Sequence, residues 1–388
     1  MPNPITYIPF GELLKNVVDN RGRTCPTANS GIPLIATNCI KIENLYPVFE
    51  KVRYVSEDVF KNWFRGHPEP GDIIFVNKGS PGRVCWVPNP LNFCIAQDMV
   101  AIRADEKKVY PKYLFAALRS ENIQGEIENL HVGSLIPHFK KGDFNDLKIP
   151  IPDKVTQKYI GDFYFTFSLK IDLLIRQNES LEQLAETLFR QWIIEEAADS
   201  WEEKGLDEIA EFLNGLACQK FPVKAGEIGL PVIKIKELRT GITDNTDIAT
   251  NDVPEKYLVQ NGDMLFSWSG SLDILIWSGG IGVLNQHLFK VSSNDFPQWF
   301  YYFWVKYHLP DFQGIAEDKA TTMGHIQRHH LSDAKVFVPP KDKLNKINET
   351  INPIFEKFKR NQIQIRSLAN LRDMLLPKLM DGEVPIIE

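Results

Sequence analysis

The residues Pro70-Gly-Asp-Ile-Ile-Phe75 return later in the chain as Asn261-Gly-Asp-Met-Leu-Phe266. In each copy a Gly-Asp pair precedes three apolar residues, which is typical of a turn followed by a short buried strand. Further matches keep the same order: Gly31-Ile-Pro-Leu-Ile35 with Gly229-Leu-Pro-Val-Ile233, and Leu147-Lys-Ile-Pro-Ile-Pro152 with Ala334-Lys-Val-Phe-Val-Pro339. The repeat covers roughly half of the chain, far more than the 20–50 residues of a solenoid unit, and therefore indicates a duplicated domain.

Each copy reads as a mixed, mainly β domain. Short β-rich runs at 72–76, 83–87 and 99–103 are separated by Gly, Pro and Asn residues. The aromatic-rich stretches 111–119 and 297–307 are expected to be helices, because a proline stands at the first turn of each. We expect their aromatic side chains to pack in the core.

A heptad pattern follows each copy. In the first arm Ile160, Phe167, Leu174, Leu181 and Leu188 recur every seven residues, and Tyr164, Ile171, Asn178, Ala185 and Trp192 each stand four residues later, as in an a/d seam. In the second arm the two corresponding sets are Ile347, Ile354, Asn361, Leu368 and Leu375, and Ile351, Phe358, Ile365, Arg372 and Leu379. Apolar residues sustained at these spacings predict two long helices.

Two asparagines interrupt the apolar seams. If the arms run antiparallel, placing Asn178 opposite Asn361 makes nearly all the remaining pairs apolar, apart from Phe167 opposite Arg372. A polar residue at such a position fixes the register, because a slipped register buries an unpaired amide. We therefore expect an antiparallel coiled coil. The alternative is that each arm packs on its own domain.

These patterns predict an α+β fold with two duplicated, mainly β domains separated by two long antiparallel helices that form a coiled coil. The expected domains are residues 1–155, a first helix at 156–198, a second domain at 199–340, and a second helix with the C-terminal tail at 341–388.

Composition limits the function classes. The net charge of -6 is unusual for a nucleic-acid-binding protein, so a DNA-binding surface requires segregated charge, such as Lys140-Lys141 and the stretch 234–239. The chain lacks a run of about 18 apolar residues and a signal peptide, which predicts a cytoplasmic protein. Its five cysteines show no Cys-x-x-Cys spacing, so we expect no disulfide framework and no structural zinc site.

The motifs of several catalytic classes are absent. The sequence contains no Walker-type phosphate loop and no Asn/Asp-Pro-Pro-aromatic tetrapeptide of an amino-methyltransferase, so we expect no catalytic residues in this chain. One pattern, Asp311 followed by Glu317 and Lys319, suggests a metal-dependent nuclease. We expect instead a solvated charge run in a loop after a helix. His325 and His329 have the spacing of a helical metal pair, but no third ligand is evident, and we expect no metal.

The chain resembles the specificity subunits of type I restriction-modification enzymes over essentially its whole length. The resemblance rests on Gly71 to Val84, Cys94 to Arg103, Ser134 to Pro152, and the closing stretch Leu371 to Val384. The second half departs from this pattern, since Leu-Asp-Ile-Leu follows Gly270-Ser271 and His287-Leu replaces Asp98-Met.

The resemblance implies two target-recognition domains, each reading one part of a split double-stranded DNA site. The helices then act as a spacer and as a docking platform for two methyltransferase subunits, which would bind S-adenosylmethionine. ATP-dependent restriction subunits are a further possible partner. Two other classes stay open: a metal-dependent nuclease, and a structural dimerising protein built on the helices.

The candidate DNA-binding residues lie in corresponding loops of the two halves. The Lys78-Gly-Ser-Pro-Gly-Arg83 loop combines small residues, the hydroxyl of Ser80 and two cations, which suits contact with phosphate or guanine, although it also fits an ordinary hairpin turn. Gln97 is expected to read adenine or to be a buried polar anchor. The remaining candidates are His138, Lys140, Lys141, Ser269, Ser271, Gln286, His325, Arg328 and His329.

Overall fold

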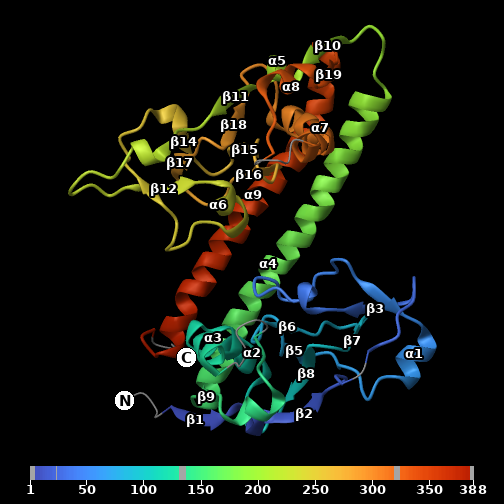
Figure 1. Ribbon diagram of the computed structural model, residues 1–388, viewed down its shortest axis with the longest axis vertical. Coiled ribbons are helices and arrows are strands. Elements are labelled where there is room, and N and C mark those ends of the chain that lie inside the picture. Colours follow the sequence, from blue (N-terminus) through green and yellow to red (C-terminus); the bar gives the residue numbers. More distant parts are fainter. Residues whose placement is uncertain (1–4, 23, 131–136, 319–323, 385–388) are drawn as a thin grey trace. The chain divides into compact units, whose positions relative to one another are not determined.

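The computed structural model describes residues 5–22, 24–130, 137–318 and 324–384 (Figure 1). The chain divides into two compact units. Unit 1 comprises Met1–Leu173 and Leu368–Glu388, and unit 2 comprises Leu174–Ser367. The two long helices, α4 (Lys154–Phe189) and α9 (Lys341–Met380), each contribute residues to both units.

Unit 1 contains two main sheets and a short antiparallel pair. The larger sheet has the order β2-β8-β5-β6, formed by β2 (Leu14–Val18), β8 (Met99–Ala104), β5 (Ile73–Val76) and β6 (Val84–Trp86). The smaller has the order β4-β3-β7, formed by β4 (Arg53–Val55), β3 (Ile32–Ile35) and β7 (Cys94–Ile95). Strand β1 (Thr6–Pro9) pairs with β9 (Lys148–Ile151), and the helices are α1 (Glu57–Asn62), α2 (Pro111–Arg119) and α3 (Glu121–Leu130).

Unit 2 repeats this topology. Its larger sheet has the order β11-β18-β15-β16, formed by β11 (Glu211–Asn214), β18 (Leu288–Ser292), β15 (Met264–Ser267) and β16 (Asp273–Ile276). The smaller is β13-β12-β17-β14, formed by β13 (Ile248–Ala249), β12 (Leu230–Ile233), β17 (Gly282–Leu284) and β14 (Leu258–Val259). Strand β10 (Glu202–Gly205) pairs with β19 (Lys335–Val338), and the helices are α5 (Leu206–Ile209), α6 (Ile235–Thr240), α7 (Gln298–Asp318) and α8 (Arg328–Asp333).

The repeated Gly-Asp pair has the same structural role in both units. Gly71 and Gly262 have φ angles of 92° and 95°, a left-handed conformation that favours glycine. The carboxylate of Asp72 accepts a hydrogen bond from the Glu69 amide at 2.8 Å and pairs with Arg103 at 2.8 Å. Asp263 likewise accepts from the Gln260 amide at 2.9 Å and lies 3.7 Å from Lys290. The motif therefore closes the turn that leads into the central strand of each sheet.

The aromatic-rich helices pack in the cores, as predicted. In unit 2, α7 buries Trp299, Phe300 and Trp304, which share a cluster with Phe189 of α4 and Ile351 of α9. In unit 1, α2 buries a run from Tyr113 to Leu118, in a cluster that also contains side chains of α4 and α9. Each long helix is therefore part of the cores.

Two buried asparagines join the long helices within unit 2. The Asn178 amide donates a hydrogen bond to the Phe358 carbonyl at 3.2 Å, and Asn361 donates to the Gln177 side chain at 2.8 Å. Residue numbers rise in opposite directions along the two helices, so this segment is antiparallel. The Oδ1 atoms of both asparagines are buried without a hydrogen-bond partner. The two amides thus lie in one stretch of the helix interface, and their role in fixing the register stays a prediction.

In unit 1, Arg372 occupies the polar position of the helix interface. Its side chain is 5% exposed, donates to the Ser168 hydroxyl at 3.2 Å, lies 5.1 Å from the centroid of the Tyr164 ring, and pairs with Asp373 at 2.8 Å. These contacts satisfy a cation at a position where the heptad pattern expects an apolar residue.

The predicted α+β fold, with two β-rich halves and two long helices packed together, is confirmed.

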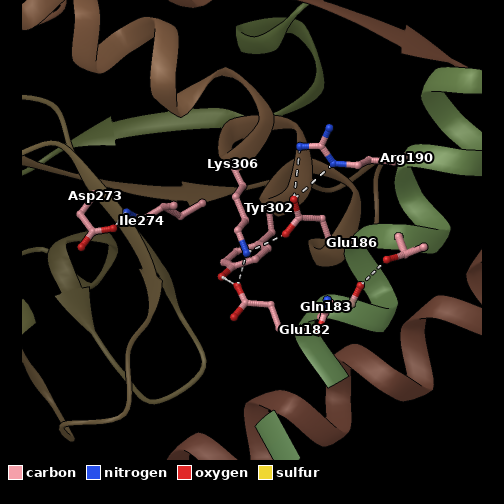
Figure 2. A network of polar contacts seen from close by, with 9 residues as sticks. Glu182, Gln183, Glu186, Arg190, Asp273, Ile274, Tyr302 and Lys306 are labelled. Carbon is pink, nitrogen blue, oxygen red and sulfur yellow. Dashed lines mark hydrogen bonds and ion pairs between the residues drawn. The ribbon is translucent and has the colours of Figure 1, made fainter. Parts of the chain in front are cut away.

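A polar network attaches α7 to α4 in unit 2 (Figure 2). The Lys306 ammonium lies 2.6 Å from Glu182 and 3.0 Å from Glu186, and the Tyr302 hydroxyl donates to Glu182 at 2.9 Å. Burial lowers the pKa of Lys306, but the bonds to the two glutamates outweigh it and raise this pKa above its ordinary value. Helices α7 and α4 are therefore connected by charge as well as by the aromatic core.

Helix α7 corrects one prediction. It continues through Pro310 to Asp318, so Glu317 lies on the helix and not in a loop after it. Phe312 and Ala316, beyond the proline, are 2% and 5% exposed and belong to the core. The burial of these two side chains stabilises the helix beyond Pro310, although proline removes one backbone hydrogen bond.

Among the described residues no helix is long and apolar enough to cross a membrane.

Candidate nucleic-acid interface

A cleft of about 660 Å³ opens at one end of the larger sheet of unit 1. We call it the basic cleft, and the described residues lining it are Asp19, Arg21, Gly22, Thr24, Arg65, Lys78, Gln97, Asp98, His138, Lys140 and Lys141. Five of these are cations and two are carboxylates, so the lining has a formal charge of 5 - 2 = +3, with His138 neutral. The structure thus collects five of the predicted residues, Lys78, Gln97, His138, Lys140 and Lys141, at one site.

Backbone hydrogen bonds bring the two predicted loops together. Lys78 and His138 form an isolated antiparallel bridge. The Gly79 amide donates to the Pro137 carbonyl at 3.0 Å, and the Phe139 amide donates to the Asn77 carbonyl at 2.8 Å. The end of β5 therefore carries the loop that leads to Lys140 and Lys141.

Arg21 and Arg65 also line the basic cleft, although the sequence patterns indicated neither residue. The buried Asn20 donates to the carbonyls of Gly66 at 3.0 Å and Ile95 at 3.1 Å, and accepts from the Arg65 amide at 2.9 Å. These bonds hold Arg65 beside Arg21. Because the segments are 45 to 75 residues apart in the chain, no local spacing revealed them.

Arg21 is held in place by Asp19. The guanidinium donates from Nε at 2.9 Å and from Nη2 at 2.7 Å to the two carboxylate oxygens, a bidentate arrangement. The Arg21 side-chain hydrogen bond, aided by charges that include Lys141, lowers the pKa of Asp19 below its ordinary value. Asp19 thus orients a cation of the cleft and offsets its charge.

Two predicted residues of the same loop lie elsewhere. Ser80 and Arg83 are not among the described residues that line the basic cleft, but occupy the turn between β5 and β6. This turn is attached to α3, because the Gln124 side chain donates to the Gly82 carbonyl at 2.9 Å. Arg83 is exposed. A contact between these two residues and DNA stays a prediction.

Unit 2 repeats the backbone of the site with different side chains. Ser269 and His325 form the bridge that corresponds to Lys78 and His138. His287 follows Gln286 as Asp98 follows Gln97, and its Nδ1 lies 3.1 Å from the hydroxyl of the buried Ser269. The hydroxyl of Ser269 is therefore already engaged, in contrast to the exposed Lys78.

The aromatic side chain of Trp268 lies at this second site. The Trp268 ring centroid lies 6.1 Å from that of His287 and 6.2 Å from that of His325, and Trp268 Nε1 donates to Asn214 at 3.1 Å. Trp268 and His287 were not predicted as site residues. The alignment of the two repeats already placed His287 against Asp98, which was the signal available in the sequence.

The other predicted residues of unit 2 are dispersed. Ser271 accepts a hydrogen bond from Arg239, and Gln286 Nε2 lies 3.4 Å from His287 Nε2. Arg328 lies over the Phe289 ring at 5.8 Å, and His329 is exposed on α8.

The metal-related alternatives receive no support from the positions of their residues. His325 lies on the bridge before α8, so it does not share a helix with His329, and the two residues do not form a helical metal pair. Asp311 and Glu317 both lie on α7, six residues apart, which places them about 120° apart around the helix axis. Lys319 lies outside the described residues. Within the described ranges there is no group of three or more His, Cys, Asp or Glu side chains suited to hold a metal ion.

Comparison with known proteins identifies the family. A family model described as the type I restriction modification DNA specificity domain matches residues 32–183 and 198–370. The type I restriction enzyme MjaIX specificity subunit of Methanocaldococcus jannaschii is 24% identical over 345 residues, covering 82% of this chain and 78% of the relative. The HindI specificity subunit of Haemophilus influenzae is 21% identical over 409 residues, covering 81% and 86%.

A solved structure shares the fold. The crystal structure of the type I restriction-modification S subunit from M. genitalium has a TM-score of 0.61 to this chain at 17% identity, covering 99% of this chain and 97% of the other.

Proposed function

Since the chain belongs to the family of type I restriction-modification DNA specificity subunits, and is itself non-catalytic, we propose that its two halves bind the two parts of a split DNA site. The basic cleft of unit 1 binds one part. The corresponding site around Ser269, His287 and His325 in unit 2 binds the other.

The observation that carries this proposal is the charge of the basic cleft. A protein with a net charge of -6 repels DNA at long range, yet five cations converge on one cavity with a local formal charge of +3. Lysine and arginine side chains at such a site bind phosphates and fix the orientation of the duplex.

We propose the partners of the chain on the same family membership. The chain assembles with DNA into a type I complex, in which methyltransferase subunits bind S-adenosylmethionine and dock on the helices α4 and α9. The duplicated halves offer two similar surfaces, which favours two copies of the methyltransferase subunit. We propose ATP-dependent restriction subunits as a further candidate partner of the complex.

Reconstitution tests this function. We expect no methyl transfer, DNA cleavage or ATP hydrolysis by the pure chain, because its sequence lacks the motifs for these reactions. Adding the cognate methyltransferase subunits and S-adenosylmethionine is expected to give adenine methylation at a split site. Methyl transfer by the pure chain, or magnesium-dependent cleavage by it, contradicts the proposal. So does a failure to bind any DNA together with the methyltransferase subunits, which instead favours a structural role.

A further inference from the structure

Asp98 is a carboxylate in a cleft whose other charges attract DNA. It lies in the loop between β7 and β8, half-exposed, and lines the basic cleft with Lys78 and Gln97. Asp19, the second lining carboxylate, is occupied by its bidentate bond to Arg21. The Asp98 carboxylate forms no hydrogen bond or ion pair within the described part of the chain. Its acceptor oxygens are therefore available to a ligand.

The backbone at Asp98 is held in an uncommon conformation. Its φ angle is 65°, and Lys51 is the other non-glycine residue with a positive φ in the described ranges. The Asp98 carbonyl accepts hydrogen bonds from the amides of Asn77 at 2.8 Å and Lys78 at 3.3 Å. Glycine adopts this conformation more readily than aspartate, so the backbone conformation alone does not explain why this position holds an aspartate instead of a glycine. A residue held in a strained conformation at a binding cleft points to a role for its side chain.

The chemistry of DNA restricts what that side chain can recognise. An ionised carboxylate only accepts hydrogen bonds, and it is repelled by phosphates. The donors that a duplex presents in its major groove are the exocyclic amino groups of cytosine N4 and adenine N6. The surrounding cations are suited to hold the phosphates, which leaves the carboxylate to contact a base.

The corresponding position of unit 2 differs in chemistry. Gln97 and Gln286 occupy equivalent positions, whereas Asp98 is replaced by His287 and Lys78 by Ser269. The same backbone framework thus presents an acceptor-only group in one half and an imidazole, 3.1 Å from a serine hydroxyl, in the other. Two halves that read different base sequences require a difference of this kind.

We propose that Asp98 is a base-reading residue, whose carboxylate accepts a hydrogen bond from the exocyclic amino group of a cytosine or adenine in the half-site bound by unit 1. The inference rests on the proposed function, because it requires DNA in the basic cleft. It adds a specificity-determining residue to a cleft whose cations bind phosphate.

The experiment uses the complex of this chain with its methyltransferase subunits. The methylated site of the wild type is mapped first, and methylation rates are then measured on duplexes in which single bases of each half-site lack the amino group, with 2-pyrimidinone for cytosine or purine for adenine. The target adenines themselves are left unchanged. The variants are Asp98→Asn, which keeps the shape and tolerates the backbone, and Asp98→Gly, which removes the side chain. Glu106→Gln is the matched control, because it removes one exposed negative charge beyond the opposite end of β8.

At one position in the half-site read by unit 1, the base analogue is expected to lower the methylation rate of the wild-type complex by about fivefold or more, the lower range for a specific base contact. In Asp98→Gly the same analogue is expected to lower the methylation rate by less than about twofold, because the carboxylate that contacts the amino group is already absent. Glu106→Gln behaves as the wild type.

Two results overturn the inference: equal analogue effects in the wild type and both Asp98 variants, or a uniform rise in DNA affinity with unchanged base preference, which indicates phosphate repulsion only. Absence of any split methylated site with the wild-type complex counts instead against the proposed function.

Discussion

Replacing Lys140 and Lys141 together by glutamine removes two of the five cations that line the basic cleft. Both side chains are exposed at the start of a short 3-10 helix (Lys141–Asn145), so the fold does not depend on their charges. Each phosphate contact contributes a slope of about -0.9 to the dependence of log affinity on log salt concentration. Loss of two contacts is therefore expected to reduce the slope by about 1.8. Over a fourfold rise in salt, the wild type is expected to lose about 12-fold more affinity than the variant.

The assay is fluorescence anisotropy of the assembled complex on a duplex that carries its mapped site, at a series of salt concentrations. The control is Lys15→Gln with Lys107→Gln, which removes the same charge. Lys15 lies on β2 and Lys107 follows β8, at the ends of these paired strands away from Asp19 and Asp98. Equal slopes for the two double variants refute the assignment of phosphate contact to the basic cleft.

Three further predictions concern the helices. Four residues inserted into α4 add about 6 Å of helix, so the unread gap of the DNA site is expected to lengthen by nearly two base pairs, and an unchanged gap in an active variant contradicts the spacer role. Replacing Asn178 and Asn361 together by leucine removes two buried amides with unbonded oxygens and is expected to raise the free energy of unfolding by about 1 kcal/mol in urea titrations; a fall contradicts this. Burial raises the pKa of Asp162, but hydrogen bonds from Lys158, Lys112 and Tyr110 outweigh it and lower this pKa to about 2, so the carboxylate stabilises the fold above its ordinary pKa and loses that effect as the pH falls toward 2. Asp162→Asn is therefore expected to cost about 1 kcal/mol at pH 7 and nothing near pH 2, and an equal cost at both pH values argues against the charge.

The duplicated fold was predictable because its determinants are local. Gly71-Asp72 and Gly262-Asp263 close the same turn, with the glycine supplying a left-handed conformation and the aspartate bonding the amide three residues earlier. Such a turn specifies the following strand within a few residues, so the pattern is visible in the sequence. The heptads of α4 and α9 are equally local.

The basic cleft was predictable in part. Lys78 and Lys140 stand in loops that carry polar and small residues, which marks them as candidates. Arg21 and Arg65 reach the cleft only through the bonds of the buried Asn20, which connect segments distant in sequence. Composition offers no signal for such an arrangement.

The extent of α7 was not predictable from local rules. A proline and a glycine near a polar run favour a helix end, which led to the wrong placement of Glu317. The buried faces of Phe312 and Ala316 decide otherwise, because tertiary packing outweighs the propensity of Pro310.

Exchange of one half tests the central claim most directly. Residues before about Val155 are replaced by those of another family member with a different target, the chimaera is expressed with its methyltransferase subunits, and methylated sites are mapped across a genome. We expect one half-site to change to that of the donor protein while the other half-site stays the same. A change in both half-sites, or in neither, contradicts two independent readers on one chain.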